Sequence, residues 1–103
     1  MKAIKVIIDH MDDTLEEAHE YYRDYVLFKE EHPRVANTAL EMAQTHLNLY
    51  TKWHEVVTYL INEHKMKEKE IPKTMQELYD FEHKKLIEEF DELSYKIRNA
   101  KNG

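Results

Sequence analysis

The chain of 103 residues contains no cysteine, and its only strong helix breakers are Pro33, Pro72 and the terminal Gly103. The absence of cysteine excludes disulfides, thiolate metal sites and cysteine nucleophiles. The scarcity of glycine and proline disfavours an all-β fold, which needs many turns. No apolar run approaches the roughly 20 residues that cross a membrane, and the apolar stretch after Met1 is too short for a signal peptide. We therefore expect a cytoplasmic protein that does not enter a membrane.

The residues that are present indicate one folded helical domain over residues 1–103. Hydrophobic residues make up 42% of the chain and charged residues 35%, a balance typical of helices with one apolar and one charged face. The aromatic content of 11% is too high for a disordered chain. The formal net charge of −6 disfavours nucleic acid as a partner, because phosphate binding requires a basic surface.

Three long segments place residues at alternating steps of three and four, the pattern of helices that pack at a shallow angle. We expect helices at about residues 3–31, 34–66 and 73–99. The prolines suit the first turns of the second and third helices, where a missing N–H leaves no acceptor unsatisfied. Because the connections are short, consecutive helices are expected to be antiparallel neighbours. The predicted fold is all-α, an antiparallel three-helix bundle of long helices. Its predicted inner positions are Ile4, Ile8, Met11, Leu15, Ala18, Tyr22, Tyr25, Lys29, Ala39, Ala43, His46, Tyr50, Trp53, Val57, Leu60, His64, Met75, Tyr79, Glu82, Leu86, Phe90, Leu93, Ile97 and Ala100.

Two features of this pattern admit two interpretations each. Thr14-Leu15-Glu16-Glu17 matches a capping box, which would leave residues 2–8 extended. A continuous first helix is favoured, because the apolar pattern extends back to Ile4 and a lone strand has no partner. Further apolar residues lie beside the predicted inner positions, and they indicate either a wide inward stripe or a self-association face. These residues are Tyr21, Phe28, Leu40, Leu47, Phe81 and Ile87.

Two histidines are predicted to lie at one level of the bundle. His19 is 13 positions before His32, and His46 is 13 positions after Pro33. Glu16 and Glu20 lie within one turn of His19. Such a layer of imidazoles and carboxylates suits iron, manganese or zinc. If His46 is buried and neutral, stability falls as the pH drops below about 6.5, and replacing it with leucine flattens the decline.

The third helix weakens the prediction of a metal site. The same count places Glu82 and His83 near Glu55 and His54, further along the second helix than His46. His10, His54 and His83 form a second possible level. A histidine in such a position is more often a hydrogen-bonded core residue than a metal ligand. The chain also has no glycine-rich phosphate loop, nucleophile elbow or His-Glu-x-x-His motif, and we expect no enzyme.

Several motifs lie along nearly the whole chain, namely Leu15…Ala18…Tyr21, Lys29-Glu30-Glu31-His32-Pro33…Ala36, Met42-Ala43, Trp53-His54-Glu55-Val56-Val57 and Ile71-Pro72…Met75…Tyr79-Asp80…His83. In these motifs the chain resembles small ferritin-like proteins of bacteria and prophages. The resemblance implies a ligand near position 19, an acidic residue at 46 and a histidine at 49, in a site for two metals. This chain has His19, His46 and Leu49 instead, so a working di-iron oxidase is not expected.

These observations favour a non-catalytic helical protein that acts through self-association or partner binding, with a homodimer as the expected oligomer and no cofactor. The alternative is a metal-binding protein that uses His19, His46 and a nearby Glu16 or Glu20 to hold iron, manganese or zinc.

Overall fold

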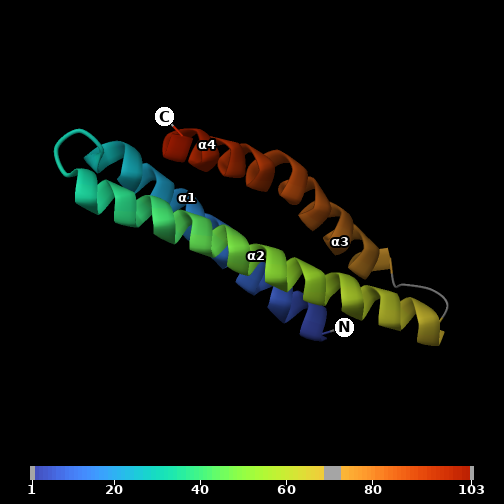
Figure 1. Cartoon of the computed structure of the whole chain (residues 1–103). Helices are drawn as coiled ribbons and strands as arrows, with labels where there is room; N and C mark the ends of the chain where they lie inside the picture. Colours follow the sequence, from blue (N-terminus) through green and yellow to red (C-terminus); the bar gives the residue numbers. More distant parts are fainter. Residues whose placement is uncertain (1, 69–72, 103) are drawn as a thin grey trace.

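The computed structural model describes residues 2–68 and 73–102, and it is all-helical over these ranges, with no strand. Helix α1 spans Lys2–Phe28 and α2 spans Pro33–Glu68. A third rod consists of α3 (Lys73–Lys85), η1 (Leu86–Phe90) and α4 (Asp91–Asn102). Figure 1 shows α1 and α2 side by side, with the third rod along them. The molecule measures 56 × 19 × 17 Å, and none of the described helices is both long and apolar enough to cross a membrane.

The hairpin between α1 and α2 is longer than predicted. Helix α1 ends at Phe28 rather than at residue 31, and residues 29–31 form a turn. The His32 N–H donates to the Phe28 carbonyl (2.8 Å), and α2 begins at once with Pro33. Lys29 is therefore exposed rather than directed inward. Helix α2 extends to Glu68, two residues beyond the predicted end, whereas Pro72 lies outside the described residues.

Helix α1 begins at Lys2, so residues 2–8 are helical and the extended alternative is wrong. The Thr14 hydroxyl donates to the His10 carbonyl one turn earlier (2.7 Å), within the helix. Thr38 makes the same bond to the Arg34 carbonyl (3.1 Å). A capping-box pattern inside a helix is satisfied in this way, because a threonine hydroxyl can bond the preceding turn.

The third rod is not one uniform α-helix. The Asp91 N–H donates to the Leu86 carbonyl five residues earlier, which is the hydrogen bond of a π-helical turn. The rod continues to Asn102, three residues beyond the prediction. The sequence pattern does not predict this turn. Leu86 and Phe90 are four residues apart, which fits the three- and four-residue steps of an ordinary α-helix.

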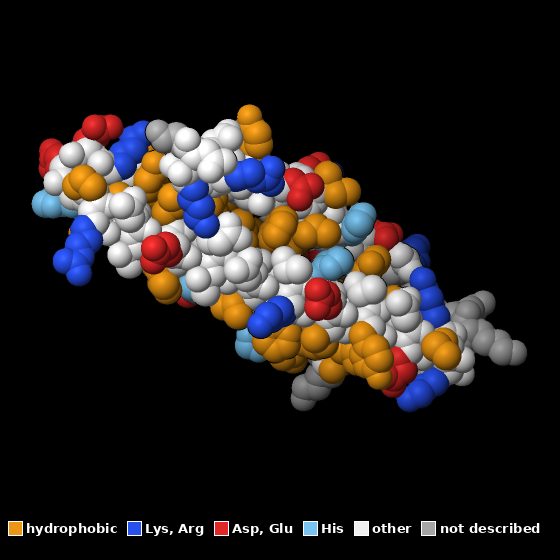
Figure 2. All heavy atoms as spheres, viewed as in Figure 1, with side chains coloured by type: hydrophobic (Ala, Val, Ile, Leu, Met, Phe, Trp, Pro, Cys, Tyr) orange, Lys and Arg blue, Asp and Glu red, His pale blue; other side chains and the backbone are white. Residues whose placement is uncertain are grey.

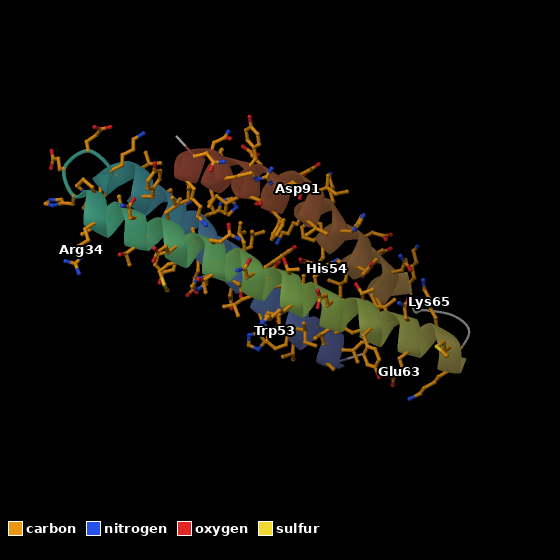
Figure 3. The ribbon with its side chains drawn as sticks, in the orientation of Figure 1. Arg34, Trp53, His54, Glu63, Lys65 and Asp91 are labelled. Carbon is orange, nitrogen blue, oxygen red and sulfur yellow. The ribbon has the colours of Figure 1, made fainter. Side chains whose placement is uncertain are left out.

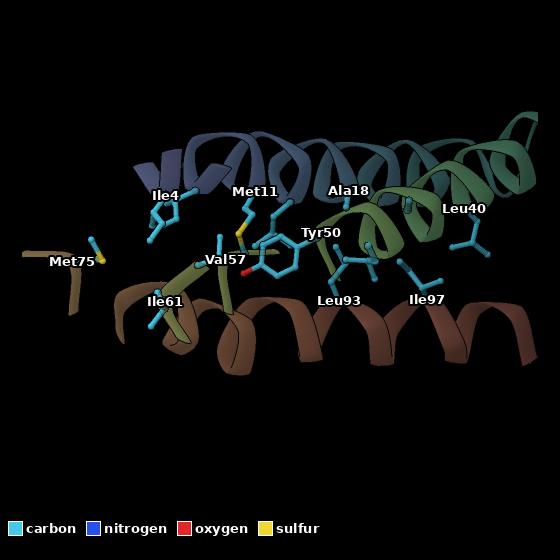
Figure 4. Close-up of a cluster of buried hydrophobic side chains, with 14 residues drawn as sticks. Ile4, Met11, Ala18, Leu40, Tyr50, Val57, Ile61, Met75, Leu93 and Ile97 are labelled. Carbon is cyan, nitrogen blue, oxygen red and sulfur yellow. The ribbon is translucent and has the colours of Figure 1, made fainter. Parts of the chain in front are cut away.

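The core lies where all three rods meet (Figure 4), with the fully buried Tyr50 side chain within it. Leu40 and Leu47 are buried, so for these two residues the wide inward stripe is the correct interpretation. Phe81 and Ile87 are exposed on the third rod. The buried apolar cluster consists of Ile4, Ile8, Met11, Leu15, Ala18, Leu40, Ala43, Leu47, Tyr50, Val57, Ile61, Met75, Leu93 and Ile97.

Candidate functional site

A buried polar cluster joins α1 to α3. The Lys85 ammonium lies 2.7 Å from the Asp12 carboxylate and 4.0 Å from the Glu82 carboxylate. Glu82 is only 2% exposed, and neither of its oxygens has a hydrogen-bond partner within the described residues. A buried carboxyl group without partners is costly when ionised. Ionisation of Glu82 at this position is therefore unfavourable.

Burial is the main cause that raises the pKa of Glu82, and the adjacent Asp12 raises it further, to about 8. Lys85 opposes this shift but does not cancel it. The pKa of Lys85 is itself raised, because its hydrogen bond and charge interaction with Asp12 outweigh the lowering effect of burial. At neutral pH the cluster thus contains an ion pair next to a protonated carboxyl group.

Tyr50 extends the cluster from α2. Its hydroxyl is buried without a hydrogen-bond partner in the described residues, and its ring stacks on Phe90 of η1 at 5.4 Å between centroids. Burial raises the pKa of Tyr50, and the nearby acids Glu82 and Asp12 raise it further. The phenol therefore stays protonated, and sequence reasoning placed it correctly on the inner face of the second helix.

A polar pocket of about 510 Å³ opens beside this cluster, between α1 and the third rod. His19 lines it, and the Nε2 atom of His19 is buried without a hydrogen-bond partner among the described residues. Burial lowers the pKa of His19; Glu89 opposes the shift and Arg23 adds to it. The lining residues are Asp12, Leu15, Glu16, His19, Arg23, Lys85 and Glu89.

His46 lies on a different face of the hairpin from this pocket. Its Nε2 atom is 2.8 Å from the Glu17 carboxylate, and its Nδ1 atom is 2.8 Å from the Met42 carbonyl. Its ring also contacts the Tyr21 ring, with 5.1 Å between centroids. Glu17 and Tyr21 flank position 19, so the count from Pro33 gives the correct level. It does not give the correct face, because His46 meets the Glu17 carboxylate and does not line the polar pocket.

The four predicted metal ligands do not share one site. Glu16 and His19 line the polar pocket, whereas Glu20 lies in a surface pocket with Asp13, Glu16 and Glu17. His46 belongs to neither pocket. Within residues 2–68 and 73–102, no three histidine, aspartate or glutamate side chains gather closely enough to hold one metal ion.

The second predicted level of histidines is an aromatic stack. Tyr79 lies between His54 and His83, at 6.5 and 6.3 Å between centroids. His10 instead stacks on Trp53 at 5.6 Å. Figure 3 labels Trp53, which meets α1, and His54, which meets α3. Burial lowers the pKa of His54, and His83 adds to the shift.

The outer face of α2 carries a second candidate site, which is apolar. Val35, Met42, Leu49 and Val56 are 36% to 50% exposed and recur every seven residues. We call these four residues the α2 stripe. Figure 2 shows hydrophobic side chains along the lower edge of the molecule, most densely toward the end where the N-terminus of α1 lies. Sequence reasoning missed the stripe, although its seven-residue spacing is readable in the sequence.

Comparisons of the chain with protein-family models, curated proteins and solved structures found no match. The site is therefore interpreted from its own geometry.

His19 and His54 carry the kind of pH dependence that the sequence predicted for His46, because burial lowers the pKa of both side chains. Since the folded pKa of His19 lies below its unfolded value, the unfolded state binds more protons as the pH falls below 6.5, and this group then lowers stability. We expect His19→Gln to remove this contribution, so that its stability relative to the wild type rises as the pH falls from 7.5 to 5 in urea unfolding. A constant difference between His19→Gln and the wild type over this range would contradict this assignment.

Proposed function

We propose that this protein is a non-catalytic helical protein that acts by associating with a second copy of itself. The observation that carries the proposal is the α2 stripe, four large apolar side chains that α1 and the third rod leave 36% to 50% exposed. Removal of apolar surface from water is the main favourable contribution to most protein–protein association. A regular seven-residue repeat is typical of a helix that packs along another helix. Scattered apolar residues on a monomer surface have no such order.

The surroundings of the stripe also favour a partner over an enzyme site. An apolar groove of about 400 Å³ lies at the hairpin end of the stripe, between Tyr21 and Phe28 of α1 and Val35 and Met42 of α2. The stripe and this groove form one continuous surface across both helices. Its shape suits a helix that lies along it.

For the fold, we propose an antiparallel three-helix bundle of ferritin-like character, in a bacterial or prophage setting. The short turn at residues 29–31, the shared core and the resemblance of the motifs support this proposal. The departures at positions 19, 46 and 49 favour a member of such a group that has no oxidase activity.

Light scattering across protein concentrations from 1 to about 500 µM tests the proposed function. We expect the apparent mass to rise from monomer to dimer with concentration. Leu49→Glu should keep the protein monomeric over the same range, because a carboxylate in an apolar interface is strongly unfavourable. Ile87→Glu, on the exposed face of η1, is the matched control and should still dimerise. A wild-type protein that is monomeric at every concentration would rule out self-association.

A further inference from the structure

The α2 stripe is symmetric about its own midpoint. Its four members are evenly spaced, so the point between Met42 and Leu49 divides it into equal halves. If a second α2 lies antiparallel with this midpoint shared, Val35 meets Val56 of the second copy and Met42 meets Leu49 of the second copy. Every stripe residue then meets an apolar residue. A two-fold interface requires this kind of self-complementarity.

The charges beside the stripe distinguish antiparallel from parallel pairing. Arg34 and Glu41 flank its first half, and Lys52 and Glu55 flank its second half. The antiparallel arrangement brings Arg34 within two residues of Glu55 of the second copy, and Glu41 within two residues of Lys52 of the second copy. A parallel arrangement brings each charged residue against the same residue of the second copy, and therefore against a like charge. Opposite charges beside a helical seam set the orientation of the partner.

These four charged residues are available for such contacts. None of them forms an ion pair with another residue within the described ranges. Arg34 lies at the hairpin end of α2 in Figure 3. It also lines the apolar groove, where it would be next to the incoming helix.

We infer that α2 pairs with α2 of a second copy of this chain, antiparallel, with the two-fold axis beside Thr45. This inference rests on the proposed self-association and specifies its interface. Val56 of the second copy then packs at Val35, where the apolar groove begins. Tyr59, 63% exposed on the next turn, reaches the same groove near Phe28. By symmetry each copy fills the groove of the other.

Because the chain has no cysteine, single-cysteine variants report the register directly. Thr45→Cys places two thiols beside the axis, and we expect more than half of the protein to become a disulfide dimer under mild oxidation. Thr38→Cys is the matched control on the same face of α2, because position 38 carries none of the four paired charges. Its two thiols would be roughly 20 Å apart in the antiparallel dimer, at about 1.5 Å per residue, far beyond the Cα separation of about 7 Å that a disulfide tolerates. We expect less than a tenth of this control to cross-link.

Charge reversal provides a second measurement on the same interface. We expect Arg34→Glu to weaken dimerisation roughly tenfold, because the symmetric dimer contains this pair twice. Adding Glu55→Arg to the same chain should restore the wild-type dissociation constant. A double variant that dimerises no better than Arg34→Glu would overturn the antiparallel pairing.

The outcomes separate this inference from the proposed function. Equal cross-linking at positions 38 and 45 would indicate a parallel pair and overturn the inference. A dimer in light scattering that does not cross-link through Thr45→Cys would overturn the register but leave self-association in place. A wild-type protein that stays monomeric would overturn both.

Discussion

Replacing Glu82 with glutamine is expected to remove the loss of stability that this carboxyl group causes as the pH rises from about 4.5 to 8. The ordinary pKa of this carboxyl group is 4.5, and burial beside Asp12 raises it to about 8 in the folded protein. Within this window the folded state holds a proton that the unfolded state has released. Stability is therefore highest below pH 4.5, as far as this group is concerned, and falls as the pH rises.

The expected contribution of Glu82 to this loss in the wild type is about 3 kcal/mol from pH 5 to pH 9. One pKa unit corresponds to about 1.4 kcal/mol, and solvent contact at Lys85 and Asp12 reduces the full effect. Urea unfolding at pH 5, 7 and 9 measures the change in the free energy of unfolding. Glu88→Gln, exposed on η1, is the matched control and should follow the wild type. Parallel declines for Glu82→Gln and the wild type would show that Glu82 ionises without penalty.

Leu47→Ala and Leu49→Ala are expected to affect different properties, although the two leucines are two residues apart on α2. Leu47→Ala should lower the stability of the monomer, and Leu49→Ala should weaken the dimer. Leu47 is fully buried in the core, whereas Leu49 is 41% exposed in the α2 stripe. Truncating a buried leucine costs about 3 kcal/mol, because it removes transfer free energy and leaves a cavity. Truncating a half-exposed leucine costs under about 1 kcal/mol in the monomer. Only the Leu49 variant should weaken the dimer.

Two measurements separate these effects. Unfolding at a protein concentration below the dimerisation range gives the stability of the monomer. Light scattering at higher concentration gives the association of each variant. If Leu49→Ala destabilised the monomer as much as Leu47→Ala, the stripe would be part of the core. If Leu49→Ala dimerised as tightly as the wild type, the stripe would not be the interface.

The helices could be predicted from the sequence because their signals are local. Pro33 begins α2, and the steps of three and four residues give most of the inner face. The assignment of Leu40 and Leu47 required the structure, since each helix contacts two others and its buried stripe is wider than one seam. The extra length of the hairpin could not be predicted from the sequence either, because the turn at residues 29–31 contains no glycine or proline to mark it.

The polar cluster was harder to predict from the sequence, because it depends on which face of each rod turns inward. Counting from Pro33 gave the level of His46 to within about one turn, but a rotation of α1 decides whether position 17, 19 or 21 meets it. Asp12 and Lys85 gave no signal of their own, since each is a common surface residue on a helix. Only the packing of α1 on α3 brings them to 2.7 Å.

The π-helical turn at Leu86–Phe90 determines where the third rod can lose a residue. It accommodates one more residue than an α-helical turn, so deleting a single residue there would leave two intact helices joined by ordinary α-helix. That deletion would keep α4 at nearly its present rotation relative to α3, so Leu93 and Ile97 would still face the core. A one-residue deletion inside α3 or α4 would instead rotate every residue beyond it by about 100°. The π-helical turn is therefore the place where the third rod can lose one residue and keep its inner face.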